Sequence, residues 1–383
     1  MKVTKLGVLA TAGPGNGGTY QYTLSMLDAL RYASGIAVTL YGDPQNPDFQ
    51  KLGFPIVGFR EPYARQLRAL AADRLHIRLG DPFAAEDVLL APIYSLSLLH
   101  TSKPFAYTLH DLQQLYYPQN FSAFQRLWRH QIYTRVSARA ARIICESEYV
   151  KADIRRFYHV AAERIVVMPA PPLGAFQTRQ GDQEVEEARS RLQLPQRFLF
   201  YPAHFWHHKN HLRLIAAFRE VALEVPDLGL VLTGKEQEGF AAAMQAIDAA
   251  GLRGKVVHLG YVAQDDIRAI YRLATALVMP SLFESISIPI YEAFQAGTAV
   301  AASGILAIPE QVGDGGLLFD PNSAQSIRSA ILEIIKDPAA AQARAARARE
   351  RIAAMTPESY GAQLEALIAS MVASHVAAQG SSR

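Results

Sequence analysis

Two glutamates, Glu284 and Glu292, are separated by seven residues in a stretch that predicts a strand, a short loop and the start of a helix. Residues 277–279 form the apolar end of the strand, Pro289 suits a first helical turn, and Gly297 is placed to end the helix. We therefore expect Glu284 in the loop and Glu292 about one turn into the helix. A helix N-terminus attracts anions, and a carboxylate accepts hydrogen bonds from vicinal sugar hydroxyls. The pair predicts a ligand with both phosphate and sugar, such as a nucleotide sugar.

A lysine and several histidines lie in the loop after another predicted strand, residues 197–202. The histidines are His204, His207 and His208. Histidine is a common zinc ligand, but no cysteine or carboxylate has a matching spacing, so no metal site is expected. Lys209 is favoured as the partner of a diphosphate, because a mobile ammonium group can neutralise a leaving phosphate. Asn210 is expected to cap the following helix.

Three further loops also follow predicted strands, and open parallel sheets bind ligands at such strand ends. Gly234 would let a ligand approach the backbone closely. Tyr261 and Val262 lie in a loop that could receive a nucleobase, although core packing explains Tyr261 equally well. His110 is expected at the carboxyl end of a strand of the first half, which makes it a candidate site residue.

A glycine-rich turn follows the first predicted strand. Gly13, Gly15 and Gly18 fit the G-x-G-x-x-G pattern of dinucleotide-binding sites, with Asp43 as a candidate acid after the next strand. This pattern raises the alternative of a nicotinamide-dependent dehydrogenase. A weaker interpretation is that Gly17 and Gly18 let a phosphate or sugar approach the backbone, and the simplest is a flexible turn.

Short apolar runs alternate with helical patterns along the chain, which indicates an α/β protein with parallel sheets. The runs form two series, separated by a polar stretch between residues 177 and 196. We expect two Rossmann-like, doubly wound domains, residues 1–175 and 176–356, and a C-terminal helix and tail in residues 357–383. The predicted strands are 6–10, 37–41, 88–91, 105–109, 142–145, 165–168, 197–202, 229–233, 255–259, 276–279, 300–302 and 316–319.

Composition excludes several classes of protein. The 383 residues are 50% hydrophobic, no run is long enough to span a bilayer, and the N-terminus lacks a signal-peptide pattern. The net charge of +3 does not indicate nucleic-acid binding. The single cysteine, Cys145, is expected to be a buried structural thiol, which favours a reducing compartment such as the cytoplasm.

Arginines are concentrated in two stretches of the first half, residues 60–78 and 124–142. The second stretch has five arginines and no acid. We expect these stretches either to form an ordinary solvated face or to contact anionic lipid headgroups at the inner face of a membrane.

Together these blocks resemble the large GT-B fold glycosyltransferase family usually catalogued as family 4, or glycosyl transferase group 1. The resemblance covers nearly the whole chain, and the paired glutamates are its most specific part. The blocks that carry it are Gly17-Gly18, His110-Asp111, Ile144–Glu148, His208–Asn210, Leu259-Gly260, Glu284 with Glu292, and Leu306–Glu310 with Gly313.

The resemblance implies two facing Rossmann-like domains, with the C-terminal helix crossing back to the first. Lys209 would contact the donor diphosphate, and Glu292 would hold the ribose. Glu284 and His110 would lie near the transferred sugar, and Gly17-Gly18 near the phosphates. The remaining donor-binding positions implied are His204, Gly234, Tyr261, Val262, Ser285, Ile286, Ser287 and Ile288.

Two positions depart from the pattern of the family. His204 stands where an arginine is common, so the second cation near the diphosphate is weaker or pH-dependent. Ser285 and Ser287 stand where glycines are common, which reshapes the sugar pocket.

The implied activity is a retaining, metal-independent transfer of a hexose, with mannose as a candidate, from a GDP- or UDP-linked sugar to a glycan or lipid-linked acceptor. Such a reaction would serve polysaccharide synthesis, need no cofactor, and use no side chain as general base. The alternatives are a sugar-nucleotide epimerase, a binding protein without catalysis, and, less favoured, a glycosidase with the two glutamates as its carboxyl pair.

Overall fold

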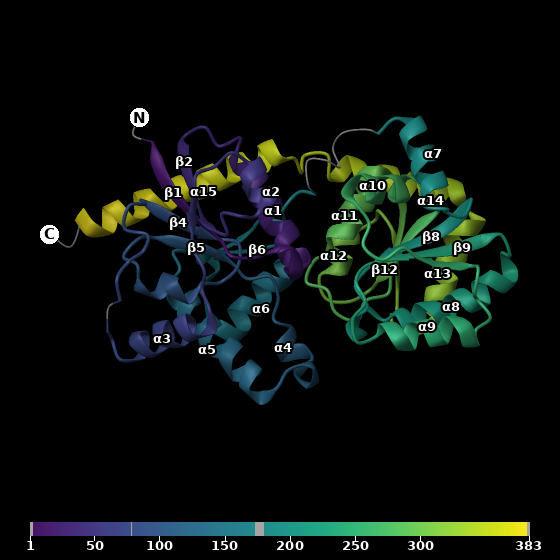
Figure 1. Ribbon diagram of the computed structural model, residues 1–383, viewed down its shortest axis with the longest axis horizontal. Coiled ribbons are helices and arrows are strands. Elements are labelled where there is room, and N and C mark those ends of the chain that lie inside the picture. Colours follow the sequence, from purple (N-terminus) through teal and green to yellow (C-terminus); the bar gives the residue numbers. More distant parts are fainter. Residues whose placement is uncertain (1–2, 78, 173–179, 381–383) are drawn as a thin grey trace. The chain divides into compact units, whose positions relative to one another are not determined.

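The computed structural model describes residues 3–77, 79–172 and 180–380. The chain divides into two compact units, unit 1 with residues 1–173 and 355–383 and unit 2 with residues 174–354. The expected domain limit at 175–176 and Arg78 of the first basic stretch lie outside the described residues. Each unit is an α/β domain with helices on both faces of a parallel sheet (Figure 1).

Unit 1 contains a seven-stranded parallel sheet in the order β3-β2-β1-β4-β5-β6-β7. The strands are β1 (Thr4–Ala10), β2 (Ile36–Gly42), β3 (Ile56–Gly58), β4 (Val88–Ala91), β5 (Phe105–Thr108), β6 (Arg142–Cys145) and β7 (Ile165–Val167). Six of them match the predicted strands to within two residues. The short edge strand β3 is absent from the prediction, because its three residues are partly or fully exposed and give no apolar run.

Seven α-helices of unit 1 are described. They are α1 (Gly18–Leu30), α2 (Pro47–Lys51), α3 (Tyr63–Arg74), α4 (Gln113–Tyr116), α5 (Ala123–Arg139), α6 (Glu148–Tyr158) and the C-terminal α15 (Pro357–Gly380). Alternate strand residues point to opposite faces, so Val8 of β1 packs in a core with α1 and α15, whereas Leu9 packs in a core with α3, α5 and α6.

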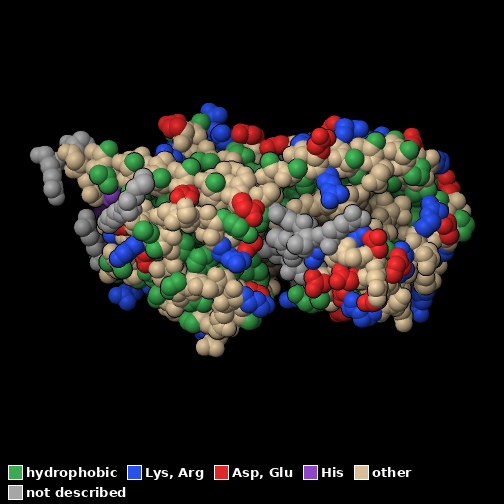
Figure 2. Space-filling view, turned by 90° about the horizontal axis from the view of Figure 1, so that it is seen from above, with side chains coloured by type: hydrophobic (Ala, Val, Ile, Leu, Met, Phe, Trp, Pro, Cys, Tyr) green, Lys and Arg blue, Asp and Glu red, His purple; other side chains and the backbone are tan. Residues whose placement is uncertain are grey.

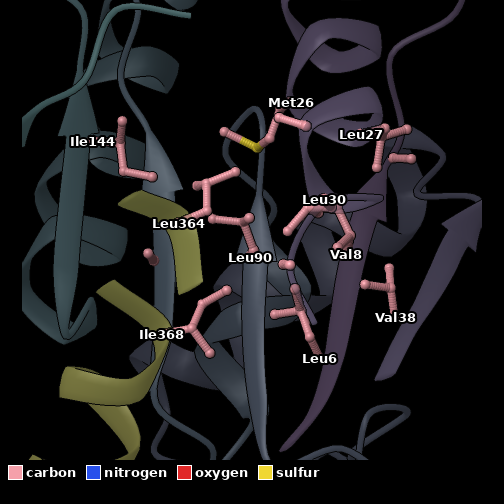
Figure 3. Packing of buried hydrophobic residues seen from close by; sticks show 14 of the residues in the cluster. Leu6, Val8, Met26, Leu27, Leu30, Val38, Leu90, Ile144, Leu364 and Ile368 are labelled. Carbon is pink, nitrogen blue, oxygen red and sulfur yellow. The ribbon is translucent and has the colours of Figure 1, made fainter. Parts of the chain in front are cut away.

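The C-terminal helix α15 packs on unit 1, as predicted. Its Leu364 and Ile368 lie beside Leu90 of β4 in the first of these cores (Figure 3). Gly361 permits a close approach to α1, because a Cβ atom there would collide with the carbonyl oxygen of Ala29. The helix continues to Gly380.

Unit 2 repeats the architecture with a six-stranded parallel sheet in the order β10-β9-β8-β11-β12-β13. The strands are β8 (Arg197–Pro202), β9 (Leu228–Thr233), β10 (Val256–His258), β11 (Ala276–Met279), β12 (Ala299–Ser303) and β13 (Leu317–Phe319). All six were predicted to within one residue at each end. The helices are α7 (Asp182–Arg191), α8 (His211–Glu224), α9 (Phe240–Ala249), α10 (Gln264–Leu273), α11 (Ile288–Ala296), α12 (Ile308–Val312), α13 (Ala324–Lys336) and α14 (Pro338–Arg351).

Both sheets reverse their strand order once, between β1 and β4 in unit 1 and between β8 and β11 in unit 2. Ligands of doubly wound sheets bind at the carboxyl ends of the strands at this reversal. The loops after these four strands are therefore the first places to look for a site.

Three general features of the described residues bear on function. None of the helices found there is long and apolar enough to cross a membrane. Acidic and basic side chains are interspersed over the face seen in Figure 2. Cys145 is fully buried, and burial raises the pKa of its thiol to about 12, as expected for the predicted structural thiol.

Candidate functional site

Lys209 and Glu284 meet at the strand-order reversal of unit 2. Lys209 ends a short 3-10 helix, η6 (His207–Lys209), that follows β8, and Glu284 lies in the loop after the neighbouring strand β11. The Lys209 Nζ atom is 2.6 Å from Glu284 Oε1, and both side chains are largely buried. The sequence predicted both residues as site residues but not that they form an ion pair.

The two loops are held in place by hydrogen bonds to backbone carbonyls. The hydroxyl of Tyr201 donates to the carbonyl oxygen of Lys209 at 2.7 Å. Asn210 Nδ2 donates to the carbonyl oxygens of Pro280, at 2.9 Å, and Pro321, at 2.8 Å. Asn210 is the N-cap residue of α8, as predicted, but its side chain makes no capping hydrogen bond. It adopts a left-handed conformation (φ 61°), and its side chain joins the β11 and β13 loops instead.

Glu292 has a different environment from Glu284. It is the fifth residue of α11, about one turn into the helix as predicted, and only 7% of it is exposed. Its Oε2 accepts a hydrogen bond of 2.7 Å from the hydroxyl of Tyr271 on α10. Burial raises the pKa of Glu292 to about 7, although the Tyr271 hydrogen bond works in the opposite direction. Glu284 thus pairs with Lys209, while Glu292 is buried against Tyr271.

The N-terminus of α11 offers fewer free N–H groups than the sequence suggests. The N–H of Ser287 donates to Gln311 Oε1 at 2.9 Å, and Gln311 Nε2 donates back to the Ser287 carbonyl at 2.6 Å. Pro289 has no N–H, and Ile290 N–H donates to the Ser287 carbonyl. Of this turn, the N–H of Ile288 has no acceptor among the described residues. An anion here would depend more on Lys209 than on the helix end.

Ser287 carries a further feature of this turn. Its hydroxyl is buried and has no hydrogen-bond partner among the described residues. Ser285, Ile286 and Ile288 around it are partly buried, so the segment expected to contact the donor is only partly open to solvent.

His204 is a neutral imidazole rather than a second cation. Its Nδ1 accepts a hydrogen bond of 2.9 Å from the N–H of Lys235. Burial, followed by the charges of Lys235 and Lys209, lowers the pKa of His204. Gly234 lies beside this loop with φ 123°, and a Cβ atom there would come within 2.5 Å of the Ala203 carbonyl oxygen. The group that closely approaches Gly234 is therefore the backbone of the loop at Ala203.

Tyr261 is 82% exposed, so the alternative that it packs in the core is wrong. It lies with the partly buried Val262 in the loop between β10 and α10. Both residues remain available to a ligand.

His110 has both ring nitrogens engaged within unit 1. Its Nδ1 is 3.0 Å from Glu146 Oε2, and its Nε2 is 2.8 Å from the carbonyl oxygen of Pro92. A carbonyl only accepts, so Nε2 carries a hydrogen. Burial lowers the pKa of His110, but the hydrogen bond and charge of Glu146 and the Pro92 carbonyl outweigh it, so the pKa is raised.

Glu146 was not predicted as a site residue. The available signal was an acid directly after a buried strand, β6, which the structure pairs with the β5 strand that precedes His110. Tyr271 and Gln311 were missed as well, and no local pattern marks either of them. Tyr271 and Gln311 are recognised only through their long-range contacts with Glu292 and Ser287.

The glycine turn also contributes to the environment of His110. Gly17 adopts φ 54° and ψ −125°, a conformation that favours glycine, and α1 begins at the next residue, Gly18. Tyr22 of α1 packs its ring edge-on to His110, with 4.6 Å between centroids. The Tyr22 hydroxyl is 3.0 Å from Thr108 Oγ1 and 3.2 Å from the hydroxyl of Tyr360 on α15. Elements β5, α1 and α15 together fix the position of His110.

Unit 1 contains a cavity of about 670 Å³ at the carboxyl ends of β1 to β4. Acidic, amide and aromatic side chains line it, including Asp43, Gln45, Asn46, Phe59, Arg60, Glu61, Gln66 and Tyr94. Asp43, the candidate acid of the dinucleotide pattern, lies 3.6 Å from Arg60 in an ion pair.

The Lys209–Glu284 and Glu292 groups belong to unit 2, and His110 with the glycine turn belongs to unit 1. Among the described residues there is no group of three or more histidine, cysteine, aspartate or glutamate side chains that could hold a metal ion.

Two family models match the chain. "Glycosyltransferase Family 4" covers residues 16–171, and "Glycosyl transferases group 1" covers residues 182–351. The curated relatives include "O-antigen chain mannosyltransferase B" of Escherichia coli, 28% identical over 51% of this chain and 51% of the relative. They also include "O-antigen chain mannosyltransferase RfbU" of Salmonella typhimurium, 24% identical over 86% of this chain and 90% of the relative. The matched stretch thus spans about half of the first relative and most of the second.

Solved structures share the fold over nearly the whole chain. The Anabaena protein Alr3699/HepE, in complex with UDP and glucose, superposes with a TM-score of 0.76 at 18% identity and covers 96% of this chain and 100% of its own. Sucrose-phosphate synthase of Thermosynechococcus elongatus gives a TM-score of 0.77 at 21% identity, with 97% and 100% coverage. This chain belongs to glycosyltransferase family 4, the group 1 glycosyl transferases, and has their GT-B fold of two Rossmann-like domains.

Proposed function

We propose that this protein transfers a hexose, specifically mannose, from a nucleoside-diphosphate sugar to a glycan or lipid-linked glycan during cell-surface polysaccharide synthesis. The observation that carries the proposal is the Lys209–Glu284 ion pair at the strand-order reversal of unit 2. Mannosyltransferase relatives of O-antigen synthesis support mannose, and the UDP complexes of the Anabaena protein support a nucleotide-sugar donor. The buried free thiol Cys145 supports a cytoplasmic site of action.

In this proposal Lys209 binds the donor diphosphate. An ammonium group has three hydrogens to donate, so Lys209 can keep its bond to Glu284 and still donate to a phosphate oxygen. Glu284 has a second carboxylate oxygen, which can accept hydrogen bonds from hydroxyls of the transferred sugar. Glu292 accepts hydrogen bonds from the ribose hydroxyls, and because its pKa is raised to about 7, it does so best above that pH.

The chemical step then requires stabilisation of the leaving nucleoside diphosphate. Lys209, with the free N–H of Ile288, offsets the charge that develops on the departing phosphate. The acceptor attacks from the face that the leaving group vacates, which retains the anomeric configuration. The departing phosphate takes the proton of the acceptor hydroxyl, so no side chain serves as general base and no metal is needed.

The acceptor is assigned to the cavity of unit 1. Its carboxylate and amide groups, such as Asp43 and Gln45, can bind hydroxyls, and the rings of Phe59 and Tyr94 can pack against the apolar face of a sugar. A volume of about 670 Å³ is within the range of small-molecule sites.

Ligand binding provides the first test. Isothermal titration with GDP, UDP, GDP-mannose, UDP-glucose and NAD, with and without a chelator, identifies the donor. We expect binding of GDP and GDP-mannose that is unaffected by the chelator. Binding of NAD alone would overturn the proposal, and binding lost on chelation would overturn metal independence. The anomeric configuration of the product, read by NMR, tests retention.

Variants of Lys209 provide the second test. Lys209→Met alone leaves the buried Glu284 without its partner, so we compare the double variant Lys209→Met/Glu284→Gln with Glu284→Gln alone. Loss of leaving-group stabilisation should lower kcat a further ~100-fold or more. Lys235→Met, which removes an exposed lysine of the next loop, is the matched control. If the double variant turns over as fast as Glu284→Gln, the role of Lys209 is wrong.

A further inference from the structure

Helices α3 and α5 of unit 1 expose an apolar ridge. Tyr63 is 48% exposed and Leu67 43% on α3, and Phe124 is 57% exposed and Leu127 59% on α5. Trp128, partly buried, connects the two helices, with its ring centroid 5.2 Å from that of Tyr63 and 6.1 Å from that of Phe124. The three rings are in mutual contact, and the two helices lie side by side (Figure 1). We call these five side chains the α3–α5 ridge. Such exposed clusters mark interaction sites.

The ridge is accompanied by arginines rather than by acids. Arg68, Arg74 and Arg126 are exposed on these helices. Arg60, beside the start of α3, is also exposed but is paired with Asp43. Neither Arg68 nor Arg126 has an ion-pair partner among the described residues. The one acid of the two helices, Asp73, is 6% exposed and already lies within 2.7 Å of two arginines, Arg135 and Arg139. An excess of positive charge therefore surrounds the ridge, unlike the face in Figure 2, where the two signs are interspersed.

An exposed apolar ridge surrounded by arginines is better suited to contact with an anionic bilayer than to exposure to water. Tyrosine and tryptophan favour the membrane–water interface, where the ring is in apolar surroundings and the polar tip is hydrated. Arginines next to such a ridge are attracted to anionic headgroups, and their aliphatic stems can lie along the apolar surface. We propose that the α3–α5 ridge inserts at the interface of an anionic membrane while the surrounding arginines contact lipid phosphates.

The position of the ridge relates membrane docking to binding of the acceptor, an inference that rests on the proposed function. Arg60, Glu61 and Gln66 line the cavity assigned to the acceptor and lie at or beside the start of α3. Tyr94, which also lines the cavity, packs against Tyr133 of α5 with 5.6 Å between centroids. Docking through the ridge thus holds the cavity next to the headgroup region, where a lipid anchor would present its glycan.

Vesicle co-sedimentation tests the docking independently of catalysis. The full-length protein is mixed with vesicles of neutral phosphatidylcholine, or of phosphatidylcholine with about a third of phosphatidylglycerol, at low and high salt. Three variants are compared with the wild type: Phe124→Ser/Leu127→Ser in the ridge, Arg68→Gln/Arg74→Gln beside it, and the control Leu223→Ser. Leu223 is 72% exposed on α8 of unit 2. Leu223→Ser therefore replaces an exposed apolar side chain by serine, as the ridge variant does, but at a position outside the ridge.

We expect binding to the anionic vesicles only, weakened by salt. Losing two charges should lower the partition coefficient roughly 30-fold, at about fivefold per arginine. The ridge variant should lose about tenfold or more, and the Leu223 variant should bind like the wild type. Absent wild-type binding at low salt, or unchanged binding of the ridge variant, would overturn the proposal. A self-association or protein partner would instead leave the protein in the supernatant with every vesicle.

Insertion itself has a separate readout. In a Trp206→Phe background, Trp128 is the remaining tryptophan, because the chain has two. Its emission should shift to shorter wavelength on anionic vesicles and be quenched by brominated acyl chains. Emission unchanged by bound vesicles would refute insertion. Nucleotide titration of the same variants separates the two proposals, since the ridge changes should leave donor binding intact even where vesicle binding is lost.

Discussion

Glu292→Gln should stabilise the ligand-free protein at high pH while weakening nucleotide binding. The wild-type carboxyl group has a pKa of about 7 in the folded protein, raised by burial from an ordinary value of 4.5. The folded state therefore holds this proton more tightly than the unfolded state does. The resulting stabilisation is fully present below about pH 4.5 and is lost as the pH rises through about 7.

The size of the effect follows from the difference between the two pKa values. Each unit corresponds to about 1.4 kcal/mol, so a difference of about 2.5 units corresponds to about 3 kcal/mol. Glutamine is uncharged at every pH and can still accept the Tyr271 hydrogen bond. The variant should therefore match the wild type near pH 4.5 and exceed its free energy of unfolding by about 3 kcal/mol at pH 8.

Urea unfolding followed by tryptophan fluorescence measures the change in the unfolding free energy of unit 2, which contains Glu292. Trp128 belongs to unit 1 and Trp206 to unit 2, so a Trp128→Phe background leaves Trp206 to report on the unit that contains Glu292. Glu220→Gln, which changes an exposed glutamate of α8, is the control and should alter stability by less than about 0.5 kcal/mol.

Nucleotide binding should respond with the opposite sign. A ribose hydroxyl bound to a carboxylate is worth about 1.5–3 kcal/mol, so Glu292→Gln should weaken binding roughly tenfold or more above pH 7. Wild-type affinity should rise as the pH passes through about 7, and that of the variant should not. A stability difference that does not change between pH 5 and 8, or a wild type more stable than the variant at pH 8, would refute the reasoning.

Three further changes test other parts of the two sites. Gly234→Ala forces a Cβ atom against the backbone of the neighbouring loop at a positive φ and should cost about 1–3 kcal/mol of unfolding free energy; a loss below 0.5 kcal/mol would contradict the packing described. Asn210→Ala removes two buried hydrogen bonds to carbonyls and should cost about 1–3 kcal/mol in the same assay, whereas an unchanged midpoint would mean that the loops hold without it. Glu146→Gln should lower the pKa of His110 in an NMR titration. The raised pKa of His110 stabilises the folded protein fully below the ordinary histidine pKa, and this stabilisation is lost as the pH rises through the pKa of His110 in the folded protein. The variant should therefore lose this pH dependence of stability. An unchanged pKa of His110 would rule out the pairing with Glu146.

The sequence by itself determined the architecture. Buried parallel strands are continuous apolar runs, and twelve of the thirteen strands in the described part of the chain were located from those runs. The exception, β3, is a three-residue edge strand whose residues are partly or fully exposed, so no apolar pattern marks it. Local backbone chemistry was also readable, since Pro289 lies in the first turn of α11 and Gly297 ends the helix in a left-handed conformation.

The tertiary structure alone decided how the site residues pair. Lys209 and Glu284 were both readable as candidates, but their ion pair depends on β8 and β11 being neighbours, although β9 and β10 intervene in the sequence. The Glu146–His110 and Tyr271–Glu292 contacts likewise join residues from different elements. Burial, charge and hydrogen bonding in these surroundings shift the pKa of His110 and of Glu292. The sequence thus identified candidate site residues, because strand ends and helix starts are local features. Their protonation and partners required the fold, because electrostatics act through space and not along the chain.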